Sequence, residues 1–245
     1  MRAGGRFHLH HLDGAAPTGP AVLWTGRAMG KSYRPKDHYF QQAKRQGLRA
    51  RSAFKLEELA ERFHLLRPGA RVLDLGAAPG GFLQVIARSV GSSGLAVGLD
   101  LVPIRPFSEA WVRTAVVDVL ADDALAQLDA VAPGPFDAVL SDLAPKTTGV
   151  RNTDEARSHR LAERALEIAR TRGKPGSAFA AKLFMGGDFE QFREQVRQVY
   201  REVKVVRPEA TRSASIEVYL VGLGLKAGTS PGPVAPSDGG AAPSI

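Results

Sequence analysis

Between about residue 72 and residue 223, strand-like and helix-like segments alternate along the chain, and this order restricts the fold more than any other feature. Short apolar runs predict strands, and apolar residues that recur every three or four positions predict helices. We expect strands at 72–75, 95–99, 115–119, 136–141, 177–184, 203–207 and 216–223. We expect helices at 82–90, 121–130, 154–170 and 189–199, and helical structure at 37–63 that breaks at Gly47. This alternation predicts an α/β fold, with a mainly parallel sheet and helices on both of its faces.

Composition separates the 245 residues into three parts. Residues 36–225 carry the alternating pattern and are long enough for one α/β domain. Residues 1–35 are rich in Gly, Pro, Ala and His, and residues 226–245 consist mainly of Gly, Pro, Ala and Ser. Both ends contain too little apolar bulk to fold, so we expect a poorly ordered N-terminal segment and a disordered tail. His8, His10 and His11 are interpreted as part of the polar N-terminal segment, and no metal site is predicted.

The absence of cysteine excludes disulfides, thiolate metal sites and a thiol nucleophile, and it fits a reducing cytoplasm. No apolar run approaches the roughly 18 residues that a membrane-spanning helix needs. The first residues also lack the apolar stretch of a secretory signal. We therefore expect a cytoplasmic protein without a membrane partner.

The net charge of +8 is concentrated in one segment. Residues 27–55 contain nine basic residues and one acidic residue, so this segment alone accounts for the net charge of the whole chain. A local basic excess indicates a polyanionic partner. A solvated basic helix without a partner is the alternative. An anionic membrane fits less well, because the segment has no sustained apolar face.

Four charged residues, Lys55, Asp142, Lys182 and Glu217, lie on the basic helix or at expected strands that are otherwise apolar. Asp142 follows the strand at 136–141, while Lys182 and Glu217 lie within the strands at 177–184 and 216–223. Burying a charge is unfavourable unless the charge is paired or used. These residues are therefore candidates for catalysis, and ion pairs that only stabilise the fold are the alternative.

A Gly-rich turn at 74–82 follows the first expected strand and opens a helix. In an open α/β sheet the ligand crevice lies at the carboxyl ends of the strands, where small residues let a ligand approach the backbone. The Asp100 carboxylate, after the second strand, can accept hydrogen bonds from the ribose hydroxyls of a nucleoside. The Asp118 carboxylate, after the third strand, can accept a hydrogen bond from an adenine amino group. The turn nearly matches a dinucleotide fingerprint, so a nicotinamide cofactor stays open. Pro79 argues against it, because proline lacks the N–H that would bind a pyrophosphate.

Five stretches of the sequence, taken together, resemble the RrmJ/FtsJ family of ribosomal-RNA 2′-O-ribose methyltransferases. They are residues 46–56, 74–82, 141–145, 182–184 and 213–219. The resemblance extends from about residue 37 to residue 223 and implies a Rossmann-like class I methyltransferase. Its sheet would have seven mostly parallel strands with the last one antiparallel, and its cofactor would be S-adenosylmethionine. Phe82 departs from the family, whose bacterial members often carry tryptophan there, but it keeps an aromatic ring.

The resemblance also implies site residues. The catalytic tetrad would be Lys55, Asp142, Lys182 and Glu217. The cofactor would be held by Gly76, Ala77, Pro79, Gly80, Gly81, Phe82, Asp100, Asp118 and Asp142. RNA phosphates would be bound by Lys31, Arg34, Lys36, Lys44, Arg45, Arg49 and Arg51. Lys182 is the candidate base, because burial and neighbouring positive charges favour the neutral form of a lysine. Lys55 would supply such a charge, Asp142 would orient the base, and Glu217 would hold one of the lysines.

By this resemblance, the expected function is S-adenosylmethionine-dependent 2′-O-ribose methylation of RNA, with a uridine of large-subunit (23S) ribosomal RNA as the target. The expected partner is ribosomal RNA or the assembling large ribosomal subunit, which places the chain in ribosome biogenesis without an obligate protein partner. Two alternatives stay open. One is a catalytically silent RNA-binding module on the same fold, and the other is a nicotinamide-dependent oxidoreductase.

Overall fold

A computed structural model describes residues 36–211 and 215–228 of the chain. The helices are α1 (Lys36–Arg45), α2 (Ser52–Phe63), α3 (Gly81–Val90), α4 (Ala124–Val131), α5 (Arg151–Arg172) and α6 (Phe189–Val199). The strands are β1 (Arg71–Leu75), β2 (Leu95–Asp100), β3 (Val112–Val116), β4 (Phe136–Ser141), β5 (Gly173–Phe184), β6 (Tyr200–Val206) and β7 (Glu217–Leu225). The predictions for residues 1–35 and for the tail beyond residue 228 lie outside the described residues.

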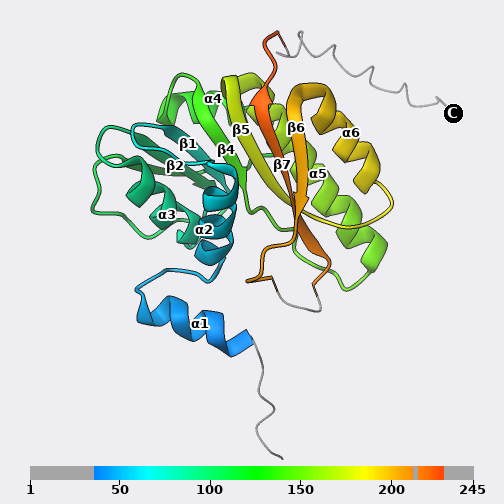
Figure 1. Cartoon of the computed structure of the whole chain (residues 1–245), viewed down its shortest axis with the longest axis horizontal. Helices are drawn as coiled ribbons and strands as arrows, with labels where there is room; N and C mark the ends of the chain where they lie inside the picture. Colours follow the sequence, from blue (N-terminus) through cyan, green and yellow to red (C-terminus); the bar gives the residue numbers. More distant parts are fainter. Residues whose placement is uncertain (1–35, 212–214, 229–245) are drawn as a thin grey trace, which may run out of the picture. The chain divides into compact units, whose positions relative to one another are not determined.

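All seven strands form one sheet in the order β3-β2-β1-β4-β5-β7-β6 (Figure 1). The strands from β1 to β5 pair in parallel, whereas β7 pairs antiparallel with both β5 and β6. The prediction of a seven-stranded sheet whose last strand is antiparallel is therefore confirmed. The strand order reverses direction between β1 and β4, and a doubly wound sheet opens its ligand crevice at such a point.

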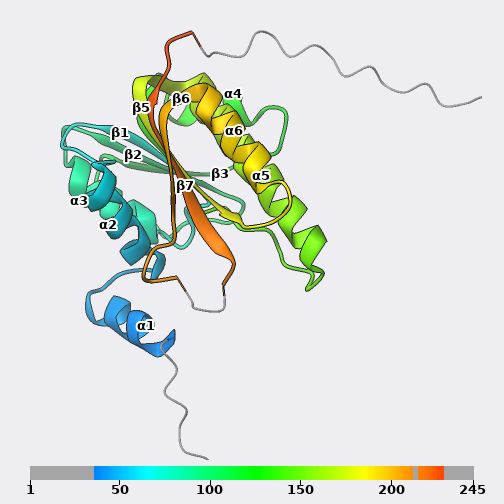
Figure 2. The same ribbon diagram turned by 45° about the vertical axis from the view of Figure 1, so that its right-hand side comes forward.

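The helices cover both faces of the sheet, as predicted (Figures 1 and 2). Helices α2 and α3 pack on one face in a core that includes Leu56, Ile86 and Tyr219. Helices α4, α5 and α6 pack on the other face in a second core that includes Leu128 and Phe192. Both cores are built from consecutive apolar strand residues, which is typical of strands buried on both faces. Within the described residues, no helix combines the length and apolar character needed to cross a bilayer.

Most element boundaries follow the sequence pattern, but the third strand was predicted three residues too late. The observed β3 is an edge strand, and all five of its residues are exposed or only half-buried. The buried apolar residues of this region are Val117 and Val119, which follow the strand and pack into the core next to α5. The apolar run therefore covers the last two residues of β3 and the start of the loop after it. The predicted break at Gly47 is confirmed, since that residue separates α1 from α2 with a φ of 66°.

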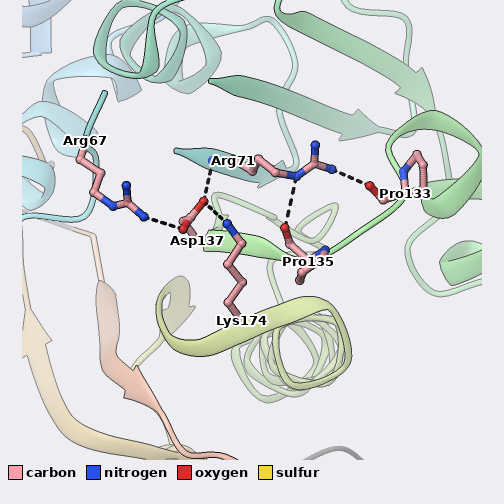
Figure 3. Close-up of polar contacts among 6 residues, drawn as sticks. All are labelled: Arg67, Arg71, Pro133, Pro135, Asp137 and Lys174. Atoms are coloured by element: carbon pink, nitrogen blue, oxygen red, sulfur yellow. Dashed lines mark hydrogen bonds and ion pairs between the residues drawn. The ribbon is translucent and has the colours of Figure 1, made fainter. Parts of the chain in front are cut away.

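The starts of the central strands are tied together by a polar cluster around Asp137 (Figure 3). The Asp137 carboxylate accepts hydrogen bonds of 2.8 Å from Arg67, from the backbone N–H of Arg71 and from Lys174. Burial alone would raise the pKa of Asp137, but the hydrogen bonds from Arg71 and Lys174 hold that pKa below its ordinary value. This cluster joins β1, β4 and β5 at the edge of the sheet opposite the carboxyl ends.

Candidate active site

The pairing of β5 with β7 brings two of the predicted catalytic residues to one place. In the register of these antiparallel strands, Lys182 lies opposite Tyr219, and Phe184 lies opposite Glu217. Side chains two residues apart on a strand share a face, so Lys182, Glu217 and Tyr219 are on the face covered by α2 and α3. The other two predicted residues reach the same region, Asp142 from the end of β4 and Lys55 from α2.

The four predicted catalytic side chains form two ion pairs. Lys182 Nζ lies 2.8 Å from Asp142 Oδ1 and also donates to the backbone carbonyl of Asp142 at 2.8 Å. Lys55 Nζ lies 3.3 Å from Glu217 Oε2. Both lysine side chains are only 7% exposed, so both ammonium groups are largely removed from water. The structure thus gathers all four residues at the carboxyl edge of the sheet.

Tyr219 joins the two ion pairs and was not among the predicted site residues. Its hydroxyl donates a 2.6 Å hydrogen bond to Asp142 Oδ1, the oxygen that also binds Lys182. Its ring lies 5.7 Å from Lys55 Nζ and stacks on Phe82 at 6.4 Å between centroids. Strand alternation contained the signal, because residue 219 must share a face with Glu217.

Electrostatics in the site keep Glu217 ionised and Tyr219 protonated. Burial alone would raise the pKa of Glu217, but the ammonium groups of Lys55 and Lys182 lower it below the ordinary value. Burial and the carboxylate of Asp142 raise the pKa of Tyr219 well above its ordinary value. Tyr219 is therefore a permanent hydrogen-bond donor to Asp142 at physiological pH.

Helix α5 fixes the end of the strand that carries Lys182. The last residue of β4, Ser141, pairs with Ala181, so β5 continues past its neighbour. Beyond that point, the N–H of Phe184 donates to Ser158 Oγ at 3.0 Å, and the Phe184 carbonyl lies 3.2 Å from His159 Nε2. These two side chains provide the hydrogen-bond partners that β4 no longer offers at Phe184, because a buried backbone group needs a partner.

A hollow of about 590 Å³ adjoins the tetrad at the carboxyl ends of β1, β2 and β4. Four of the residues predicted to hold the cofactor line it, namely Gly76, Asp100, Asp118 and Asp142. Gly76 is needed there, since its φ is 79° and a Cβ would lie 2.9 Å from the backbone of Leu143.

The other predicted cofactor residues, Ala77, Pro79, Gly80, Gly81 and Phe82, do not line this hollow. Phe82 is buried against Tyr219, and Gly80 and Gly81 pack against the segment before α2. Hollows of about 490 and 500 Å³ along α5 contain none of the predicted site residues.

The turn beside the hollow suits a nucleoside better than a dinucleotide. The lining is mixed in charge, with Asp100, Asp118 and Asp142 beside Lys146, Arg157 and Arg160, so the distinction comes from the backbone of the turn and not from the net charge. The N–H of Ala78, which a pyrophosphate would need, already donates to Asp100 at 2.8 Å. Asp74 is fully buried beneath the turn, and burial, then Asp142 and Asp100, raise its pKa well above the ordinary value. The residues present fit S-adenosylmethionine, because the carboxylates of Asp100 and Asp118 would accept hydrogen bonds from its ribose and adenine groups.

The predicted RNA-binding residues differ in their surroundings. Lys44 and Arg45 are exposed in the last turn of α1. Arg49 is half-buried, and its guanidinium binds backbone carbonyls within the protein. Arg51 precedes α2 and is also half-buried. Lys31, Arg34 and the side chain of Lys36 lie outside the described residues.

The fold and the site together define a Rossmann-like methyltransferase of class I, as expected from the resemblance. The model of the FtsJ-like methyltransferase family matches residues 48–225, and the chain belongs to this family. The nicotinamide alternative is thereby disfavoured.

Curated relatives agree with this assignment. A ribosomal RNA large subunit methyltransferase E of Myxococcus xanthus is 64% identical over 203 residues, which cover 83% of this chain and 95% of the relative. Its namesake in an Anaeromyxobacter species is 54% identical over 198 residues, covering 81% and 72%. A solved ribosomal RNA methyltransferase from Plasmodium falciparum has the same fold, with a TM-score of 0.61 at 21% identity, over 72% of this chain and 98% of that one.

Proposed function

We propose that this enzyme transfers a methyl group from S-adenosylmethionine to a ribose 2′-oxygen of large-subunit ribosomal RNA, with a uridine of the 23S RNA as the target. The observation that carries the proposal is the ion pair of the buried Lys182 with Asp142, beside a hollow that Gly76, Asp100 and Asp118 also line. The names of the curated relatives support the RNA class, since they are ribosomal RNA large subunit methyltransferases. The family resemblance and the grouping of the tetrad support the 2′-oxygen as the acceptor.

Lys182 is the general base of the proposed reaction. When bound, S-adenosylmethionine supplies a methyl group on a positively charged sulfur. The 2′-hydroxyl of the RNA is a weak nucleophile at neutral pH. The Lys182 ammonium first releases a proton to solvent, and its neutral Nζ then accepts the hydroxyl proton as the methyl–oxygen bond forms and the methyl–sulfur bond breaks. Asp142 holds Lys182 with two acceptors, Oδ1 and the backbone carbonyl, both at 2.8 Å. This fixed position contributes to the rate because alignment of the acceptor oxygen with the methyl group is most of the task.

Lys55 and Glu217 complete the site from the other side. Lys55 Nζ supplies a positive charge next to the oxygen that loses its proton, and such a charge stabilises the negative charge that develops there. Glu217 holds this ammonium in place through the 3.3 Å ion pair. Asp100 and Asp118 hold the nucleoside part of the cofactor, with Asp100 fixed by backbone N–H groups of Ala78 and Val102.

The basic segment before α2 binds RNA phosphates in this proposal. Lys44 and Arg45 present their charges on the exposed side of α1. Binding to phosphates releases counterions, so RNA affinity falls steeply with salt. The enzyme then acts on ribosomal RNA or on the assembling large subunit, in the cytoplasm.

The proposal is tested with large ribosomal subunits from a bacterial strain that lacks its own enzyme of this family. The purified protein and tritiated S-adenosylmethionine should label the 23S RNA, and mapping of 2′-O-methyl groups should give one uridine. Lys182→Ala should abolish labelling and leave cofactor affinity nearly unchanged. Lys204→Ala is the matched control, because Lys204 is an exposed lysine of β6 that pairs with Glu202.

Each alternative predicts a different result in the same experiment. A silent RNA-binding module would bind the subunits without labelling them, and an oxidoreductase would be stabilised against heat by a nicotinamide dinucleotide and not by S-adenosylmethionine. Strong residual labelling by Lys182→Ala would remove that residue from its role as the base.

A further inference from the structure

Arg49 ties the basic segment to the loop that follows Asp100. The residue lies in the linker between α1 and α2, within the segment proposed to bind RNA. Its guanidinium donates to the backbone carbonyl of Arg105, and to that of Pro106 at 2.7 Å. The same group lies 3.6 Å above the centre of the Phe107 ring. One side chain thus holds three consecutive residues of a loop more than fifty positions away.

The linker that carries Arg49 is itself docked on the start of α3. The backbone N–H of Arg49 donates to Gln84 Oε1 at 2.6 Å, and Gln84 Nε2 donates to the Gly47 carbonyl at 3.1 Å. Gly80 makes room for the contact, because a Cβ at this position would lie 2.9 Å from Arg49 Cδ and 3.1 Å from Phe107. The Gly-rich turn, the linker and the loop therefore pack on one another at Arg49.

The loop held by Arg49 belongs to the cofactor site at its other end. Leu101 lines the hollow, and Asp100 binds the N–H of Val102 at 3.1 Å. The loop is therefore fixed at its start by Asp100 and, a few residues later, by Arg49. A substitution at Arg49 therefore changes how firmly Leu101 is held at the hollow, through the short stretch of backbone between Leu101 and Arg105.

We propose that Arg49 is a positioning residue that couples RNA binding to cofactor binding. This inference rests on the proposed function, because it takes the basic segment as the RNA site and the hollow as the cofactor site. RNA phosphates bound by Lys44 and Arg45 restrain the linker, and the linker holds the cofactor loop through the Arg49 guanidinium. Coupling between two sites is reciprocal, so RNA raises the affinity for the cofactor and the cofactor raises the affinity for RNA by the same factor.

The test uses Arg49→Lys, which keeps the charge but loses the planar fork that reaches two carbonyls. Titration calorimetry with S-adenosylhomocysteine, the demethylated product, measures cofactor-site affinity without turnover. We expect the Kd of Arg49→Lys to rise about tenfold. We expect unmethylated 23S RNA transcript to tighten the wild-type Kd about fivefold or more, and to have little effect on the variant.

Arg45→Ala is the control, because Arg45 carries the same charge on the exposed side of α1. It should weaken RNA binding and leave the Kd for S-adenosylhomocysteine unchanged when RNA is absent. Phe107→Leu provides a second variant that removes the stacking contact alone. When both substitutions are combined, the loss of binding free energy for S-adenosylhomocysteine should be smaller than the sum of the losses in the two single variants, because the two residues form one contact.

A Kd for S-adenosylhomocysteine within twofold of wild type in Arg49→Lys would overturn the proposal. An RNA effect that persists unchanged in this variant would overturn it as well, even if the Kd rises, because a purely structural role would give that result. If instead the wild type binds S-adenosylhomocysteine and RNA but methylates no RNA, the proposed function fails and the coupling measurements still stand.

Discussion

Replacing Tyr219 by phenylalanine removes one hydroxyl from the centre of the site and leaves the rest in place. The ring keeps its contacts with Phe82 and Lys55, because neither involves the hydroxyl. The Asp142 carboxylate loses the 2.6 Å hydrogen bond and keeps its ion pair with Lys182, while the backbone N–H of Asp142 still donates to Leu75. A hydrogen bond to a charged group contributes about 1.5–3 kcal/mol. If that energy serves to hold Asp142 and Lys182 in the reactive position, kcat should fall about 10- to 150-fold.

The stability of the protein should change much less, because the substitution leaves no buried donor unpaired and creates almost no cavity. We expect a loss of about 1 kcal/mol or less in the free energy of unfolding by urea. The assay is methyl transfer to large ribosomal subunits at saturating S-adenosylmethionine. Tyr200→Phe is the matched control, since Tyr200 is equally buried but packs in the core on the other face of the sheet.

A kcat for Tyr219→Phe within twofold of wild type would refute the reasoning, because it would show that Asp142 needs only Lys182 to stay in position. A similar loss in Tyr200→Phe would also refute it, since both variants would then report general loosening of the sheet.

Three further predictions concern charges elsewhere in the chain. The lowered pKa of Asp137 contributes stability above its unfolded value near 4, and this contribution is lost as the pH falls through the folded value. Asp137→Asn should therefore lose about 1–3 kcal/mol at pH 7, and its deficit in urea unfolding should shrink below about pH 4. The raised pKa of Asp74 has the opposite sign, so its contribution to wild-type stability should fall by up to about 1.4 kcal/mol per pH unit between the unfolded pKa near 4 and the raised folded pKa. Asp74→Asn should remove this slope and melt at a higher temperature than wild type at pH 8; equal melting temperatures would contradict the raised pKa. Replacing both Lys44 and Arg45 by alanine should reduce the slope of log K for RNA against log salt by about 1.4–1.8, and an unchanged slope would place the phosphates elsewhere.

The sheet was predictable from local pattern, because apolar runs indicate the strands. Asp142 and Lys182 were candidates because a charge in or next to such a run is unfavourable unless it is paired or used. The tetrad as a set came from the family resemblance. Lys182 and Glu217 met as expected because β7 is antiparallel, a feature that came from the family resemblance and not from the pattern.

Residues whose role depends on distant contacts were missed. In the sequence, Tyr219 is an ordinary aromatic residue of a strand. Only the fold brings Asp142, which directly follows β4, against its hydroxyl. Arg49 reads as one more cation of a basic segment, and only the fold places the carbonyl of Pro106 beside it. The error in β3 has a related cause, because an edge strand carries little apolar signal of its own.

The reversed direction of β7 decides which end of that strand lies beside Lys55 and Lys182. Glu217 is its first residue, and it meets Phe184, the last residue of β5. A parallel β7 of the same nine residues would carry Glu217 to the far edge of the sheet, about 30 Å away, beside the cluster around Asp137. The parallel strands present only their last residues at this edge of the sheet. Because β7 runs the other way, it presents its first residue there, and that residue is the carboxylate that holds Lys55.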